Sequence, residues 1–239
     1  MSSKKDKQID SIIAGTGKGA ERNIAETYVL VNSLHPVIQR LLTNEAQFTE
    51  MRILGFQLSS EDIQAIAYAL TENKTLRALS LDHLQSGNEG AKQIAQGLCY
   101  NESLTYLSMR WNNIGDEGGA AIADSLHYNK GLKMLVLSYN NLGDKAGQSF
   151  AVALKKNNSL EQLDLKWNQI GDEAGDMMLD AMSESQSLSV LLLSGNGTTL
   201  RNVGKGGKKK ASKRSRSMRF LSGIGKDKDL EDGTMSLGK

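Results

Sequence analysis

A fixed period of 28 residues runs through the central part of the chain. The pattern Leu-x-x-Leu-x-Leu/Met-x-x-Asn occurs four times in register, and its copies open at Leu104, Leu132, Leu160 and Leu188. Two earlier copies keep the apolar positions but lack the Asn, and they open at Leu76 and Phe48. A repeat of this length predicts a solenoid of six units, because one unit cannot bury its apolar face without its neighbours.

Each unit is predicted to contain a strand followed by a helix. Apolar residues alternate around Leu107, which is typical of a short strand with one buried face. The Gly-Asp pair after the Asn predicts a turn and a helix start, with caps for free amides at Asp116, Asp144 and Asp172. Apolar residues then recur at helical spacing from Ile122 to Leu126. We expect the Asn after each strand to be buried and to bond backbone groups of the turn, which is a structural role.

Units that all wind the same way predict the α/β class, with parallel strands on one side and parallel helices on the other. Strands stack about 4.8 Å apart whereas helices need about 10 Å, so the array should bend with the strands on the inside. The predicted shape is a right-handed horseshoe whose strands form the concave face.

Two strings carry a resemblance to a known family. They are LTYLSMRWNNIGDEGGAAIADSL, from residue 104, and LEQLDLKWNQIGDEAGDMML, from residue 160. Both resemble the ribonuclease-inhibitor-like class of leucine-rich repeat, and the likeness covers about residues 36 to 196. The resemblance implies a binding scaffold whose concave strand face and adjoining loops hold a protein partner.

The period divides the chain into four predicted regions. They are a flexible N-terminal segment (1–23), an N-terminal helical cap with a partial repeat (24–47), the leucine-rich repeat domain (48–200) and a basic, disordered C-terminal tail (201–239). In the second region Pro36, the one proline of the chain, is predicted to open a helix, because Ile38 falls 28 residues before Ile66. The alternative is an independent helix that binds a partner.

The sixth unit is incomplete at its C-terminal side. It has the strand pattern from Leu188 but then reads Gly-Asn-Gly-Thr-Thr and never shows the helical half. Because an unpaired strand edge is normally covered in proteins, we expect residues 198–224 or a second protein to pack over this last strand.

The outward positions near the end of each strand are where the units differ, so we expect the partner there. The position seven residues after each opening holds Gly55, His83, Trp111, Tyr139, Trp167 and Gly195. Their rings should form a row along the lip of the concave face. Neighbouring outward positions add Arg77, Asp82, Tyr106, Arg110, Asp164 and Lys166. Two interpretations stay open: a structural ladder that stiffens the solenoid, or anchors in a protein interface, where Trp, Tyr and Arg dominate.

The C-terminal tail has the composition of a polycation. Residues 201–219 hold nine Lys or Arg and no acid, and the candidate anion-binding residues are Lys208, Lys209, Lys210, Lys213, Arg214, Arg216 and Arg219. Such a segment can bind RNA, an anionic membrane or an acidic protein surface. Nuclear import and a merely solubilising role are the alternatives.

Other sequence features bear on compartment and chemistry. The first residues are charged and no long apolar run follows, so we expect neither secretion nor a transmembrane segment. The single Cys99 cannot form an internal disulfide, which favours a reducing compartment. The three histidines fall on different registers, and the recurring Asp and Glu pairs are explained as helix caps. We therefore expect no metal, cofactor, small-molecule substrate or catalytic site, and a cytoplasmic location with cytoskeletal or nuclear placement as alternatives.

These features favour a non-catalytic scaffold that binds a protein on its concave face and an anionic surface through its tail. Such a module could be a subunit of a cytoskeletal or ciliary assembly. One alternative is a GTPase regulator similar to Ran GTPase-activating protein, which shares this repeat class but has a longer arc and an acidic tail. The other is a nucleic-acid-associated adaptor that acts through the basic tail.

Overall fold

The computed structural model describes residues 26–29, 35–53, 58–199, 203–204 and 219–220. The strands are β1 (Glu26–Val29), β2 (Glu50–Ile53), β3 (Ala78–Ser80), β4 (Tyr106–Ser108), β5 (Met134–Val136), β6 (Gln162–Asp164), β7 (Val190–Leu192), β8 (Val203–Gly204) and β9 (Arg219–Phe220). The helices are α2 (His35–Leu42), α3 (Ser60–Glu72), α4 (Gly87–Tyr100), α5 (Asp116–Ser125), α6 (Asp144–Lys156) and α7 (Asp172–Glu184).

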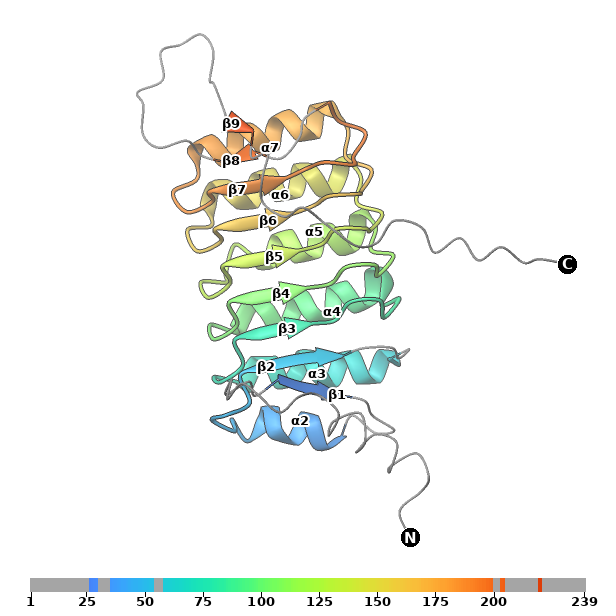
Figure 1. Cartoon of the computed structure of the whole chain (residues 1–239), viewed down its shortest axis with the longest axis vertical. Coiled ribbons are helices and arrows are strands. Elements are labelled where there is room, and N and C mark those ends of the chain that lie inside the picture. Colours follow the sequence, from blue (N-terminus) through green and yellow to red (C-terminus); the bar gives the residue numbers. More distant parts are fainter. Residues whose placement is uncertain (1–25, 30–34, 54–57, 200–202, 205–218, 221–239) are drawn as a thin grey trace, which may run out of the picture.

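The strands form one sheet in chain order, and the helices form a second layer behind it (Figure 1). From β1 to β7 all neighbours are parallel. From β2 onward each parallel pair joins residues one period apart, as in Leu79 with Leu107 and Leu135 with Leu163. The predicted α/β leucine-rich repeat solenoid is therefore confirmed. Of the helices that the structure describes, none is long and apolar enough to cross a membrane.

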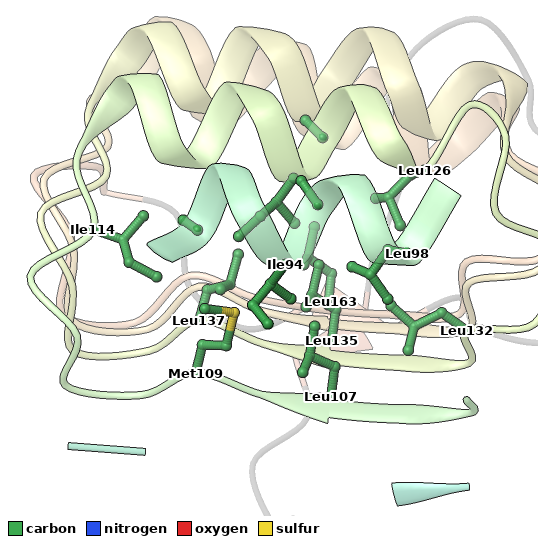
Figure 2. Close-up of a cluster of buried hydrophobic side chains, with 14 of the residues drawn as sticks. Ile94, Leu98, Leu107, Met109, Ile114, Leu126, Leu132, Leu135, Leu137 and Leu163 are labelled. Carbon is green, nitrogen blue, oxygen red and sulfur yellow. The ribbon is translucent and has the colours of Figure 1, made fainter. Parts of the chain in front are cut away.

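One continuous apolar core fills the space between the two layers. Leu107, Leu135 and Leu163 are fully buried and repeat along the sheet, as Figure 2 shows. Ile94 and Leu98 of α4 pack toward them from the helix layer. Removing one such leucine side chain typically costs about 2–5 kcal/mol. The apolar positions of the repeat thus supply the main stabilising contacts between successive units.

The Asn after each of the strands β4 to β7 is the second repeated element, and its predicted structural role is confirmed. The side-chain Nδ2 of Asn140 donates to the carbonyl of Met109 at 2.9 Å. Its Oδ1 accepts from the backbone N–H groups of Asn112 and Ile114, both at 3.0 Å. These bonds satisfy turn groups that no strand or helix could pair. We call Asn112, Asn140, Asn168 and Asn196 the asparagine ladder.

Asp116 and Asp144 at the helix starts do cap free amides, but they cap the helix of the following unit, while Asp172 accepts from the backbone N–H of Thr199 in the last turn. Oδ1 of Asp116 accepts from the backbone N–H of Gly143 at 2.8 Å and of Ala146 at 3.0 Å, at the start of α6. Asp144 serves Gly171 in the same way at 2.6 Å. The N-cap positions are glycines with no side-chain cap of their own. An acceptor near a helix N-terminus also interacts favourably with the helix dipole.

The N-terminal region differs from the expectation of a mainly helical cap. Glu26–Val29 form β1, which pairs in parallel with β2, so the partial repeat has a strand as well as a helix. The helix α2 begins at His35 and contains Pro36 in its first turn, as predicted. The Thr-Tyr-Val sequence of β1 favours strand structure, and the free edge of β2 offers backbone partners, which a count of helical spacings ignores.

The C-terminal edge of the repeat array is covered by the chain itself. Within the described residues no helix follows β7, as the sequence predicts. Instead β8 pairs antiparallel with β7, and β9 pairs antiparallel with β8. The expectation that part of residues 198–224 covers the last strand is confirmed. The prediction of disorder throughout 201–239 is wrong for β8 and β9, because the unpaired backbone groups of β7 provide a template that composition does not reveal.

Candidate functional site

Four aromatic side chains stack along the lip where the strands end. Neighbouring ring centroids lie 5.6 Å apart for His83 and Trp111, 4.1 Å for Trp111 and Tyr139, and 5.7 Å for Tyr139 and Trp167. The ring planes differ by no more than 13°. The predicted row is therefore confirmed, and we call these four residues the aromatic row.

The backbone under the aromatic row is in a conformation that bulky residues rarely adopt. The φ angles are 61° at His83, 56° at Trp111, 59° at Tyr139 and 56° at Trp167. The amide of each residue is held by the next unit; that of Tyr139, for example, donates to the carbonyl of Lys166 at 2.9 Å. A left-handed backbone at a bulky side chain costs of order 1–3 kcal/mol and persists only where the surroundings enforce it.

Gly195 continues this register after Trp167. Its φ is 78°, in the same left-handed region. A Cβ atom at this position would lie only 2.5 Å from Cδ2 of Trp167. The glycine therefore lets the indole of Trp167 lie against the backbone of the next unit, and it ends the aromatic row.

The two tryptophans stand out from the surface on either side of a recessed tyrosine. Trp111 is 48% exposed and Trp167 is 53% exposed, whereas Tyr139 between them is half-buried. The three rings, together with Asn113, Asn140 and Asn141, line a shallow hollow of about 330 Å³. Large exposed apolar side chains gathered at one place are typical of an interaction site.

A row of side-chain amides lies beside the aromatic row, and sequence analysis missed it. Nδ2 of Asn141 donates to Oδ1 of Asn113, and Nε2 of Gln169 donates to Oδ1 of Asn141 at 3.3 Å. We call Asn113, Asn141 and Gln169 the amide row. The signal was in the sequence, since every aromatic residue of the row is followed two positions later by Asn or Gln.

The other candidate residues on the strand face are engaged with their neighbours. Oδ1 of Asp82 accepts from Oγ of Ser108 at 2.6 Å and from the backbone N–H of Arg110 at 2.8 Å. Asp164 is only 2% exposed, and its Oδ2 lies 3.8 Å from Nζ of Lys166. These charges therefore organise the surface locally and offer less to a partner than the lip does.

The remaining strand-face positions differ in exposure. Arg77 is exposed, although its Nη1 donates to the carbonyl of Ser103 at 2.9 Å, and Tyr106 is half-buried at the start of β4. Val136, whose side chain points to the outer face by strand alternation, is fully buried. Apart from Arg77, the accessible part of the predicted site is therefore concentrated in the aromatic row.

Comparisons with known proteins agree with this architecture. A family model described as Leucine Rich repeat matches residues 100–123, 128–151 and 156–179. The chain is a leucine-rich repeat protein. A search of the curated proteins gave no match.

Two solved structures show the same fold as this leucine-rich repeat protein. The first is Leiomodin-1 Actin-Binding Site 2, with a TM-score of 0.55 and 22% identity over 64% of this chain and 90% of that chain. The second is the tropomodulin C-terminal domain of Caenorhabditis elegans, with a TM-score of 0.55 and 18% identity over 64% of this chain and 93% of that chain.

The candidate anion-binding residues of the tail are not placed by the fold. Lys208, Lys209, Lys210, Lys213, Arg214 and Arg216 lie outside the described residues. Arg219 contributes its backbone to β9, which pairs with β8. The polycationic contact therefore stays a prediction from composition.

Several titratable groups in the repeat array have shifted pKa values. Burial raises the pKa of the Cys99 thiol, so at neutral pH it stays protonated and weakly nucleophilic. Lys92 and Glu117 pair at 2.9 Å on the helix face, and their hydrogen bond raises the pKa of Lys92 and lowers that of Glu117. Among the residues with described positions, no group of three or more His, Cys, Asp or Glu could hold a metal ion.

Proposed function

We propose that this leucine-rich repeat protein is a non-catalytic interaction scaffold of the cytoskeleton, and that it binds a partner protein through the aromatic row. The observation that carries the proposal is the pair of half-exposed tryptophans held on a left-handed backbone. Trp and Tyr are the side chains most enriched among residues that dominate protein interfaces.

Stability alone is a weak reason for aromatic residues at these positions. A left-handed backbone costs of order 1–3 kcal/mol at a bulky residue, whereas one aromatic contact returns about 0.5–1.5 kcal/mol beyond its buried area. Gly195 shows that the same register accepts glycine, which adopts this conformation without strain. Because the core and the asparagine ladder already join the units, recognition explains the aromatic row better than stiffening does.

The fold suggests which partner to test first. One of the two similar structures is named as an actin-binding site of leiomodin-1. Actin is therefore the partner that we propose for this protein. If actin does not bind, another cytoskeletal protein is the next candidate.

The test compares actin binding by the full chain and by the double variant Trp111→Ala, Trp167→Ala. Truncating an interface hot spot costs at least about 2 kcal/mol, so the double variant should bind at least about 30-fold more weakly in cosedimentation with filaments or titration of monomers. The matched control is Tyr100→Ala with Tyr128→Ala, two side chains that are 75% and 69% exposed on the helix layer. Equal binding by all three proteins would remove the aromatic row as the site.

We further propose that the basic tail adds an anionic contact to this scaffold. Residues 201–239 hold twelve Lys or Arg against four Asp or Glu, while the whole chain has a net charge of only +2, so the rest of the chain is acidic. Binding of the full chain to heparin should weaken steeply with added salt, as counterion release requires. A version that ends at Leu200 should not bind, and a salt-independent affinity would contradict the electrostatic account.

A further inference from the structure

The aromatic row has a shape that selects for the conformation of its partner. Trp111 and Trp167 form the two walls of the hollow, and the recessed ring of Tyr139 is stacked between them, so the hollow lies over its edge. The stacked rings leave their edges open to solvent, and the edge of an aromatic ring carries partial positive charge. A partner group that lies in this hollow must therefore be compact and apolar, with electron-rich atoms beside it.

Hydrogen-bond donors at the rim are unused. No hydrogen bond within the described residues involves the indole N–H of Trp111 or Trp167. The amide nitrogen of Asn113 likewise has no acceptor there, since Asn113 takes part in the amide row only through its Oδ1. The rim thus offers donors to carbonyl oxygens at both walls of the hollow.

The spacing of the two walls restricts the partner's backbone. Because Trp111 and Trp167 occupy the same position two units apart, they are separated by two strand spacings, about 9.6 Å. A polyproline II helix repeats every three residues with a rise of about 3.1 Å, which is about 9.3 Å per turn. In an extended strand, side chains on the same face are about 6.7 Å apart at every second residue and about 13.4 Å apart at every fourth. Neither distance matches the separation of the two tryptophans.

Hydrogen bonding separates the polyproline II helix from an α-helix. An α-helix repeats approximately every seven residues, about 10.5 Å, but its carbonyls are already bonded within the helix. A polyproline II segment has no internal hydrogen bonds, so every carbonyl is available to the indole and amide donors. Aromatic-lined grooves are a general means of recognising this preformed conformation.

We propose that the aromatic row binds a proline-rich segment of the partner in the polyproline II conformation. Pyrrolidine rings one turn apart lie against Trp111 and Trp167, and carbonyls between them accept from the indole N–H groups and from Asn113. This inference rests on the proposed function, because it gives the chemistry of the partner at the same surface.

The experiment titrates the full chain with decaproline and follows tryptophan fluorescence. Both tryptophans of the chain belong to the aromatic row, so the signal reports on this site alone. We expect a saturable change with decaproline and none with a Gly-Ser peptide of equal length or with an alanine-rich helical peptide. By calorimetry, Trp111→Ala or Trp167→Ala should weaken decaproline binding by about 30-fold, the loss typical of a hot spot. Tyr100→Ala with Tyr128→Ala should bind as the wild type does.

A second pair of variants keeps the proposal testable if the alanine variants misfold. Trp111→Phe and Trp167→Phe retain a ring but remove the N–H donor, so we expect them to fold and to bind decaproline at least about fivefold more weakly, the loss of one hydrogen bond of about 1 kcal/mol. Absence of binding, or binding that none of these variants changes, overturns the proposal. If actin binding still depends on Trp111 and Trp167 in that case, the proposed function stands and only the partner's conformation is wrong.

Discussion

The asparagine ladder and the aromatic row occupy neighbouring positions of the repeat, and three units carry both, yet their environments are opposite. Asn112 is fully buried, and its side chain hydrogen-bonds backbone groups of the preceding turn and of its own turn. Trp111, the residue before it, is half-exposed, and its indole N–H has no acceptor within the described residues. The side-chain amide of Asn112 is fully engaged within the fold and cannot bind a partner. The ring and the indole N–H of Trp111 are available to one. In this solenoid a 28-residue period is therefore compatible with both structural and recognition roles, and burial separates the two.

The comparison predicts the largest loss of stability in the asparagine ladder. Asn140→Ala removes five hydrogen bonds and leaves the carbonyl of Met109 and the N–H of Ile114 without partners. Since each unsatisfied buried group costs about 1–3 kcal/mol, we expect a loss of at least about 3 kcal/mol in the free energy of unfolding, measured with urea. The control is Asn141→Ala, which changes an exposed neighbour. A similar loss of stability in both variants would contradict the claim that the buried asparagine ladder, and not the exposed position beside it, stabilises the fold.

A smaller effect is expected at the end of the aromatic row. Gly195→Ala places a Cβ 2.5 Å from Trp167 and forces an alanine into the left-handed region. We expect the free energy of unfolding, measured with urea, to fall by about 1–2 kcal/mol, which is the cost of that backbone conformation for a residue with a Cβ. Displacement of Trp167 should also shift its fluorescence. Gly197→Ala is the matched control, because its added Cβ would meet only a backbone oxygen 3.6 Å away.

The aromatic row itself should contribute little to folding. Trp111→Gly loses two stacking contacts, each about 0.5–1.5 kcal/mol, and the burial of about half of its side chain, but it also removes the strain of a left-handed tryptophan, about 1–3 kcal/mol. Because the relief of strain offsets part of the loss, we expect the free energy of unfolding, measured with urea, to fall by less than in Asn140→Ala. A loss as large as that of Asn140→Ala would favour the structural ladder over the interface.

The smallest effect concerns pH at the last turn. Hydrogen bonds, first from the backbone N–H of Thr199 and then from the hydroxyl of Thr198, hold the pKa of Asp172 below its ordinary value. Because the folded pKa is the lower one, the carboxylate stabilises the fold above the unfolded-state pKa, and this contribution is lost as pH falls through the folded pKa. The stability difference between wild type and Asp172→Ala should therefore shrink in acid. A difference that is constant with pH would show that the carboxylate's charge is irrelevant.

Periodicity predicted the features that repeat and missed those that depend on an edge. Leu107, Leu135 and Asn140 were placed correctly, because residues at matching positions of successive units share one environment. The covering of β7 by part of residues 198–224 was expected from its open edge, but the strand structure of β1 and β8 was missed, because each strand forms by pairing with an available neighbour and not from a local pattern.

The candidate site was predicted in part for the same reason. The aromatic row followed from register alone, but the burial of Asp164 and Val136 depends on contacts that a list of outward positions cannot show. The amide row could have been found from Asn113, Asn141 and Gln169, which recur with the period as regularly as the rings do.

The placement of the helix caps gives the array a direction. Asn88 accepts from the backbone of Gly115, Asp116 from that of Gly143 and Asp144 from that of Gly171, so at α5, α6 and α7 the acceptor comes from the earlier coil. During synthesis on the ribosome, each emerging helix start meets an acceptor that has already been made. Deleting N-terminal coils would leave backbone N–H groups at the start of the new first helix without their acceptor. Deleting C-terminal coils would leave the acceptors of all remaining helices in place.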